Sequence, residues 1–245
     1  MKMNITYDAK DIKMIQSVVE LQTNATFLKN RIAVMKKPKI TKEIFWKSII
    51  MGLLTSQQKS SPNSPINKIL STKPFIFGLN QLDVGNKKLQ QLIIQKMNSK
   101  SGIRFVNVIS LRIFENYNIF MNEWIDLEKR SKQIIKMKGR ERINAEREFA
   151  FHLQDLFVGI GPKQSRNILQ FLGIALYEIP IDSRSMKWIH QNLSFPFPLN
   201  AKIMINEEYY CFVLNFIQNI CDKAKVRPAI FDAAVFSSFR ETKGS

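Results

Sequence analysis

Two glycines interrupt an otherwise helical pattern between residues 149 and 173, and this interruption limits how the chain can fold. An amphipathic stretch is followed by Gly159 and Gly161, which lie two positions apart between apolar residues. Pro162 then occupies a favourable first position of a helix, and the apolar face of that helix runs to Gly173, a typical C-terminal cap. The sequence therefore predicts two helices joined by a tight glycine turn, which is a helix-hairpin-helix.

Helical periodicity also dominates the rest of the chain. Segments 42–54, 103–128 and 207–223 carry apolar residues three or four positions apart, or are long and apolar. No Asn-Gly or Asp-Gly hairpin signal lies between alternating runs. These patterns predict an all-α fold.

Three segments break the helical pattern. Residues 59–66 contain two prolines and should end a helix. The basic run 129–148 is typical of a solvated face or of a helix pair with a charged outer surface. Residues 194–200 form a turn stiffened by prolines, which suits a crossover between domains.

The charge balance indicates a polyanionic partner. The 245 residues include 37 Lys and Arg against 20 Asp and Glu, a formal net charge of +17. Nucleic acid fits this excess better than a membrane surface, because the longest apolar stretch, 44–54, is interrupted by Lys47 and Ser48. The first residues contain no apolar run typical of a signal peptide, so we expect an intracellular protein, in the cytoplasm and nucleoid or in a nucleus.

Cysteine and histidine are too few for a metal centre. Cys211 and Cys221 lie ten residues apart in one expected helix, which disfavours a disulfide and suits a reducing compartment. Together with two histidines they do not form a zinc or iron–sulfur signature. We therefore expect no metal.

The hairpin suits contact with a DNA backbone, and two charged residues follow it. The glycines expose bare backbone, and the N–H groups that open the second helix can bind a phosphate; an ordinary connection between helices remains the alternative. Lys163 lies two residues after Gly161, and Asp182 lies nineteen residues after Lys163. Taken singly, Lys163 could be a further phosphate contact and Asp182 the N-cap of a helix that starts near Arg184.

Three sequence landmarks together resemble one enzyme superfamily. They are GIGPK followed by IPID, which contain Lys163 and Asp182, then LLTSQQ at 53–58, and FDAAVFSSFR at 231–240. This pattern is similar to the helix-hairpin-helix (HhH-GPD) DNA glycosylases, which include endonuclease III and the 8-oxoguanine DNA glycosylases. The interval between lysine and aspartate resembles the 8-oxoguanine branch.

The resemblance implies a fold and a reaction. It implies a two-lobed helical protein with its active site in the cleft between the lobes. One lobe would be a helical barrel over 43–178 that contains the helix-hairpin-helix at about 149–173, and the other would combine 1–42 with 179–245. The protein would be a bifunctional glycosylase and AP lyase that flips an oxidised purine, chiefly 8-oxoguanine, out of double-stranded DNA. Lys163 would attack the sugar, Asp182 would stabilise the cationic sugar, and the enzyme would act as a monomer.

The same matching implies roles for further residues. Gly159, Ile160 and Gly161 would contact the DNA backbone, and Gln57 would fill the gap left by the flipped nucleotide, unless it is only a polar helix terminus. Arg184 stands where the family usually has histidine and can hold a phosphate. Phe236 resembles an aromatic that stacks on the extruded base, although a helical phenylalanine is more often part of a core.

Departures from the family pattern leave alternatives open. The four-cysteine cluster of endonuclease III relatives is absent, which implies no iron–sulfur cofactor and disfavours oxidised pyrimidines as substrates without excluding them. The resemblance also allows a structural monovalent cation at the hairpin. A DNA-binding protein without catalysis is the third reading, in which Lys163 and Asp182 would be incidental.

Overall fold

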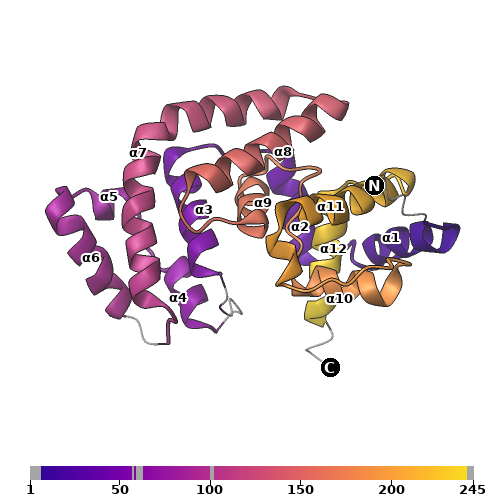
Figure 1. Ribbon diagram of the computed structural model, residues 1–245, viewed down its shortest axis with the longest axis horizontal. Helices are drawn as coiled ribbons and strands as arrows, with labels where there is room; N and C mark the ends of the chain where they lie inside the picture. Colours follow the sequence, from indigo (N-terminus) through magenta and orange to yellow (C-terminus); the bar gives the residue numbers. More distant parts are fainter. Residues whose placement is uncertain (1–6, 57, 59–62, 100–101, 242–245) are drawn as a thin grey trace.

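The computed structural model describes residues 7–56, 58, 63–99 and 102–241, and helices dominate these ranges (Figure 1). The described residues contain no β-strand, so the all-α prediction is confirmed. The elements are α1 (Ala9–Leu21), α2 (Thr26–Lys36), α3 (Lys42–Leu54), α4 (Pro65–Ser71), α5 (Leu79–Leu82), α6 (Asn86–Asn98), α7 (Val106–Lys136), α8 (Gly139–Leu156), α9 (Pro162–Phe171), α10 (Ser183–Asn192), the 3-10 turn η1 (Ile203–Ile205), α11 (Glu207–Lys223) and α12 (Pro228–Glu241).

Two separate clusters of buried apolar side chains organise these helices. The first core extends from Phe45 to Ala175 and draws on α3 to α9. The second core combines Ile15 to Leu28 with Ile179 to Val235, and so joins α1 and α2 to α10, α11 and α12. In Figure 1 the second group of helices lies to the right of the first. We propose that these cores belong to the two lobes expected at 43–178 and at 1–42 with 179–245.

The crossover segment, residues 174–181, connects the two cores. The buried carboxylate of Glu146 on α8 accepts hydrogen bonds from three consecutive N–H groups of this segment, at 2.9 and 3.0 Å from Leu176, 2.8 Å from Tyr177 and 3.1 Å from Glu178. Arg142 pairs with Glu146 at 2.9 Å. A buried charge needs such partners, and here the partners hold the backbone of the crossover in place.

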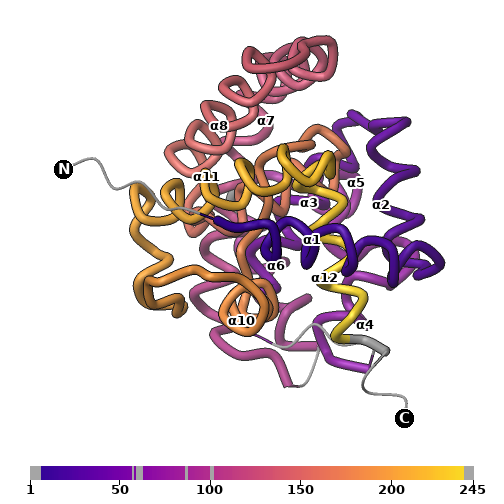
Figure 2. Tube along the Cα trace, turned by 90° about the vertical axis from the view of Figure 1, so that its right-hand side faces the viewer, coloured from indigo at the N-terminus to yellow at the C-terminus, as the bar shows by residue number. Residues whose placement is uncertain are grey.

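Helix α7 is longer than the sequence pattern suggested. It was expected within 103–128, but the basic run continues it to Lys136. Leu127, Ser131 and Ile134 remain on a buried face, and Lys132 pairs with Glu128 at 2.8 Å, so the extension is packed on one side and charged on the other. From Gly139 the chain returns as α8, and the two helices project together from the body (Figure 2). Of the two readings of the basic run, the helix pair is confirmed.

The proline-rich turn at 194–200 does not connect domains. Phe195 and Leu199 are buried within the second core, on the same side of the crossover as the helices that flank the turn. The expectation of a crossover here was wrong, because prolines set the local stiffness of a turn but not which core it packs against. Cys211 and Cys221 both lie in α11 and are free thiols, as expected.

Candidate active site

The hairpin between α8 and α9 has the geometry expected of a glycine turn. Gly159 has a φ of +81°, in the left-handed region that favours glycine. A Cβ at this position would lie 2.6 Å from Cδ of Arg112. The buried amide of Asn116 on α7 accepts from the N–H of Val158 at 2.8 Å and donates to its carbonyl at 2.9 Å. The side chain of Asn116 therefore holds the turn, a role that no sequence pattern indicated.

The three hairpin residues predicted to contact DNA differ in what they expose. Gly159 is exposed, and the space where a Cβ of Gly161 would lie is open to 4 Å. The side chain of Ile160, by contrast, is 4% exposed and packs in the first core. The side chain of Ile160 is therefore enclosed by the core, its N–H is bonded to the Phe157 carbonyl, and contact of these three residues with DNA stays a proposal.

Helix α9 presents its first turn directly after the hairpin. Pro162 is its first residue and Gly161 its N-cap, without a side-chain cap. The first intrahelical bond runs from Ser165 N–H to the Gly161 carbonyl at 3.0 Å, so the N–H groups of Lys163 and Gln164 have no partner within the helix. Free donors and the positive end of the helix dipole make this turn suited to an anion. At its other end α9 closes on Gly173 with a φ of +78°, as predicted.

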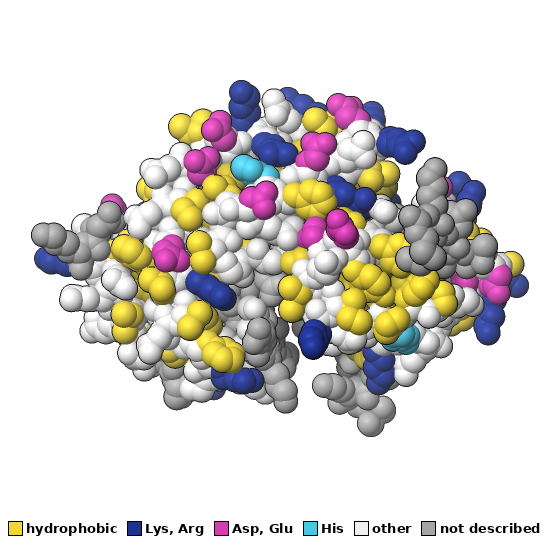
Figure 3. Space-filling model, in the orientation of Figure 1, with side chains coloured by type: hydrophobic (Ala, Val, Ile, Leu, Met, Phe, Trp, Pro, Cys, Tyr) yellow, Lys and Arg dark blue, Asp and Glu magenta, His cyan; other side chains and the backbone are white. Residues whose placement is uncertain are grey.

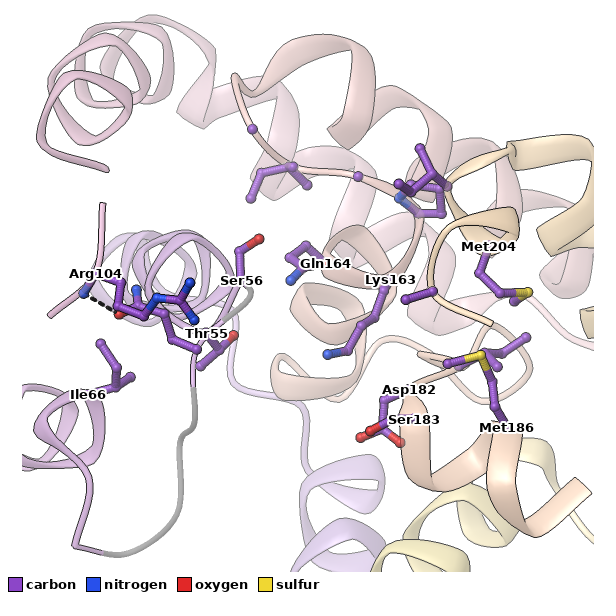
Figure 4. Close-up of a pocket in the computed structure, with 18 of the residues that line it drawn as sticks. Thr55, Ser56, Ile66, Arg104, Lys163, Gln164, Asp182, Ser183, Met186 and Met204 are labelled. Carbon is purple, nitrogen blue, oxygen red and sulfur yellow. Dashed lines mark hydrogen bonds between the residues drawn. The ribbon is translucent and has the colours of Figure 1, made fainter. Parts of the chain in front are cut away.

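Lys163 extends from this first turn toward Asp182 (Figure 4). Burial lowers the pKa of its ammonium, the charge of Asp182 acts in the opposite direction, and Arg184 lowers the pKa again. The ion pairs of the described residues do not include one between Lys163 and Asp182. Lys163 forms no ion pair with any residue in the described part of the chain, and an amine with a lowered pKa that is not held by a carboxylate is suited to act as a nucleophile.

Asp182 is the N-cap of α10, which the sequence indicated as one interpretation of this residue. Its Oδ1 accepts from the N–H groups of Arg184 at 2.8 Å and Ser185 at 3.1 Å, and its Oδ2 accepts from the Arg184 guanidinium. Burial opposes the charged carboxylate, but the hydrogen bond and charge of Arg184 outweigh it, and the pKa of Asp182 is lowered. The carboxylate is thus held ionised beside Lys163.

Arg184 and Phe236 contact each other rather than the cleft. The guanidinium carbon of Arg184 lies 3.9 Å from the ring centroid of Phe236, and the ring of Phe27 on α2 stacks on Phe236 with centroids 4.1 Å apart. Two groups this close to the same centroid must cover opposite ring faces. An extruded base can therefore stack on Phe236 only if Arg184 moves. The side chain of Arg184 is itself 39% exposed, and its predicted contact with a phosphate stays a proposal.

Asp232 is a charged neighbour of the site that the sequence did not reveal. It lies on α12, 8% exposed, within an apolar run that reads as ordinary core. Burial raises the pKa of its carboxyl to about 6, although Arg31 lowers it, and Asp182 raises it further. Its charge also acts on Lys163, whose pKa it raises. Only the packing of α2 and α10 against α12 brings these groups together.

A cleft of about 1430 Å³ joins these elements. Figure 3 shows the surface indented between the two groups of helices. One wall contains Thr55, Ser56 and Gln58, which follow α3. The opposite wall includes the apolar side chains of Met186 and Met204. Lys163 and Asp182 both line the cleft, together with Arg104, Arg112, Gly159, Gly161, Gln164, Lys202, Ile205 and Tyr210. Gln57 lies outside the described residues.

Neither a metal-binding cluster nor a membrane-spanning helix occurs in the described part of the chain. Within the ranges given above, no group of three or more His, Cys, Asp or Glu side chains could hold a metal ion. At the hairpin, two carbonyls that could face a cation already accept hydrogen bonds: that of Val158 from Asn116, and that of Phe157 from the N–H of Ile160 at 3.2 Å. A structural monovalent cation at the hairpin therefore stays a proposal. No helix of the described chain is long and apolar enough to cross a membrane.

Comparison with known proteins places the fold. Neither protein-family models nor curated protein sequences give a match. Among solved structures, the chain is similar to the 8-oxoguanine glycosylase/lyase of Methanocaldococcus jannaschii in complex with a 15mer DNA containing 8-oxoguanine. The TM-score is 0.64 at 15% sequence identity, over 94% of this chain and 98% of the other. The resemblance inferred from sequence motifs is thus confirmed at the level of the fold.

Proposed function

We propose that this protein is a DNA glycosylase with AP lyase activity. The observation that carries the proposal is the position of the Lys163 amine, which extends into a cleft opposite an ionised Asp182 and forms no ion pair with any of the described residues. Burial lowers the pKa of that amine, which increases the neutral, nucleophilic fraction at physiological pH. A protein that only bound DNA would gain nothing from a lysine that is easily deprotonated.

The proposed reaction uses these two side chains. The neutral amine of Lys163 forms a bond to the anomeric carbon of the flipped nucleotide while the glycosidic bond breaks. The electron pair of that bond leaves with the base, which takes up a proton. Asp182 stabilises the positive charge that develops on the sugar. Ring opening then gives a Schiff base on Lys163, β-elimination expels the 3′ phosphate, and hydrolysis releases the amine.

Double-stranded DNA is the proposed partner. The net charge of +17 favours a polyanion, and the first turn of α9 offers backbone N–H donors for a phosphate next to Lys163. Arg104, Arg112 and Lys202 line the same cleft and add positive charge along it. Such contacts position the duplex without reading its sequence. We propose that the protein acts as a monomer inside the cell.

Oxidised purine, chiefly 8-oxoguanine, is the proposed base. The cleft wall beside Asp182 is apolar, with Met186, Met204 and Ile205, and such a wall suits the flat face of a flipped base. The solved structure with the similar fold holds DNA with 8-oxoguanine. This similarity and the interval between Lys163 and Asp182 favour the purine over an oxidised pyrimidine.

Borohydride trapping tests the proposal. Wild-type protein and a duplex with one 8-oxoguanine should give a covalent adduct, and Lys163→Gln should give neither adduct nor base release. DNA affinity should stay nearly unchanged, because phosphate contacts are distributed over many of the 37 basic residues. Lys202→Gln is the control, since it removes another lysine of the same cleft: it should still give the adduct at saturating protein, even if it lowers DNA affinity.

The outcomes separate the alternatives. An adduct that persists in Lys163→Gln would mean that another residue is the nucleophile. Adducts formed only with oxidised pyrimidine duplexes would overturn the assignment of the base. Tight DNA binding without an adduct on any lesion duplex would leave a DNA-binding protein without catalysis.

A further inference from the structure

A buried arginine connects the first turn of α9 to the second core. The side chain of Arg166 is fully buried, one helical turn after Lys163. Its Nη1 donates to the carbonyl of Pro162 at 3.2 Å, and its Nε donates to the carboxylate of Glu178 in the crossover at 2.9 Å. Its Nη2 donates to Glu207 on α11 at 2.7 Å. One guanidinium thus bonds to three elements that surround the cleft.

A buried tyrosine continues this connection to the residues before Asp182. The hydroxyl of Tyr210 donates to the carbonyl of Ile179 at 3.0 Å and accepts from the N–H of Ile181 at 2.6 Å. The tyrosine is 0% exposed, so water does not replace these bonds. The guanidinium carbon of Arg166 lies 4.8 Å from the centre of its ring, within reach of a cation–π contact.

These contacts form a continuous path between the two sides of the site. The path runs from Pro162, the neighbour of Lys163, through Arg166 and Tyr210 to Ile181, the neighbour of Asp182. Lys163 and Asp182 belong to different helices and share no ion pair, so their separation depends on the groups behind them. A displacement of about 1 Å between reacting groups can lower a rate by about 10²-fold.

We propose that Arg166 and Tyr210 are positioning residues that fix Lys163 relative to Asp182. This inference rests on the proposed function of that pair. Neither side chain needs to touch DNA: Arg166 is enclosed by its partners, and the Tyr210 hydroxyl is bonded to backbone on both sides. Their effect should appear in the rate of the chemical step and not in the affinity for DNA.

Tyr210→Phe is the most selective test, because it removes one oxygen and keeps the ring that Arg166 contacts. The neighbouring Tyr209→Phe is the control. The Tyr209 hydroxyl also donates to a backbone carbonyl, that of Pro198 at 2.8 Å, but this bond is exposed and does not involve the residues before Asp182. Both variants lose one tyrosine hydroxyl, and only Tyr210→Phe loses contact with the residues before Asp182.

The measurement is single-turnover excision at saturating enzyme, with DNA affinity measured separately at the same salt concentration. We expect Tyr210→Phe to lower the rate constant about tenfold or more, with affinity within about twofold of wild type. Tyr209→Phe should match wild type in both. If Tyr210→Phe does not fold, Glu207→Gln takes its place, because it removes the partly exposed carboxylate that accepts from Arg166. This variant should lower the rate constant about threefold and leave the affinity for DNA unchanged.

Each outcome has one meaning. The positioning role would be overturned if the wild type forms the adduct but the folded Tyr210→Phe, or Glu207→Gln in its place, keeps the wild-type rate constant. The proposed function would still stand in that case. An equal loss in Tyr209→Phe would show a general effect of stability and would also overturn the positioning role. Absence of an adduct in the wild type would overturn the proposed function, and the positioning role with it.

Discussion

Asp182→Asn separates the two roles that the structure gives to Asp182, as helix cap and as charged partner of Lys163. Asparagine caps helices about as well as aspartate, so the bonds from Oδ1 to the N–H groups of Arg184 and Ser185 should survive. The lost interaction is the ion pair with Arg184, whose side chain is 39% exposed. The side chain of Asp182 is only 15% exposed, which puts this pair at the upper end, about 1 kcal/mol, of what solvent-screened pairs contribute. The free energy of unfolding should therefore fall by about 1 kcal/mol at most.

The catalytic effect should be larger. Loss of a group that stabilises charge in the transition state lowers a rate by about 10²-fold or more, which corresponds to about 2.7 kcal/mol in the barrier. Protonation of Lys163 does not account for such a loss. Asp182 raises the pKa of Lys163, so its removal lowers that pKa and makes the amine more available. A slower reaction with a more available nucleophile would identify the carboxylate as the missing group.

The assay is single-turnover base excision, followed together with thermal unfolding. Arg184→Gln is the control, since it breaks the same ion pair and keeps the carboxylate. We expect Arg184→Gln to retain most of the excision rate that Asp182→Asn loses. The reasoning is refuted if Asp182→Asn excises within about threefold of wild type, or if both variants lose the same rate. In either case Asp182 would serve as a cap and ion-pair partner only.

Four further substitutions test other parts of the site. Phe236→Ala should lower the free energy of unfolding by about 3 kcal/mol. The preference for lesion over undamaged DNA should stay unchanged, because both faces of the ring are covered. A loss of about 1–3 kcal/mol in the binding free energy of lesion DNA alone would restore the base-stacking role. Gly159→Ala should cost about 1–2 kcal/mol of stability because its φ is +81°, and Gly161→Ala, in open space, should cost less than about 0.5 kcal/mol; equal losses would contradict the strain argument. Asp232→Asn removes a charge that raises the pKa of Lys163. The pH below which the trapping rate falls, because Lys163 becomes protonated, should therefore shift to a lower value. A shift to a higher pH would be incompatible with this coupling.

Local chemistry explains which parts of the fold could be predicted from the sequence. The glycine turn, Pro162 at the start of α9 and Gly173 after its end depend on backbone preferences of single residues, and the structure reproduces all three. The cap at Asp182 belongs to the same class. Lys163 and Asp182 were predicted from a motif, and both line one cleft.

The missed features depend on contacts between distant residues. Asn116 holds a hairpin 42 residues later in the chain, and Tyr210 holds a segment about thirty residues earlier. Asp232 reads as part of an apolar run, and only the packing of α12 against α2 and α10 gives its charge a role. Phe236 was matched to a base-stacking aromatic, but the side chains that cover it come from α2 and α10. A single sequence contains no signal for such pairings.

The bonded backbone of the crossover segment bears on which partner would deform in the proposed complex with DNA. A hinge needs a few residues whose backbone angles can change freely. Here Glu146 holds the N–H groups of Leu176 to Glu178, and Tyr210 holds Ile179 and Ile181. Rotation of one core against the other at this link would break several buried bonds, so in the proposed complex we expect the duplex to bend when a nucleotide reaches Lys163. The cost of bending then depends on the bases that flank the lesion, and the same lesion should be bound more tightly beside a flexible pyrimidine–purine step than within a stiff A-tract.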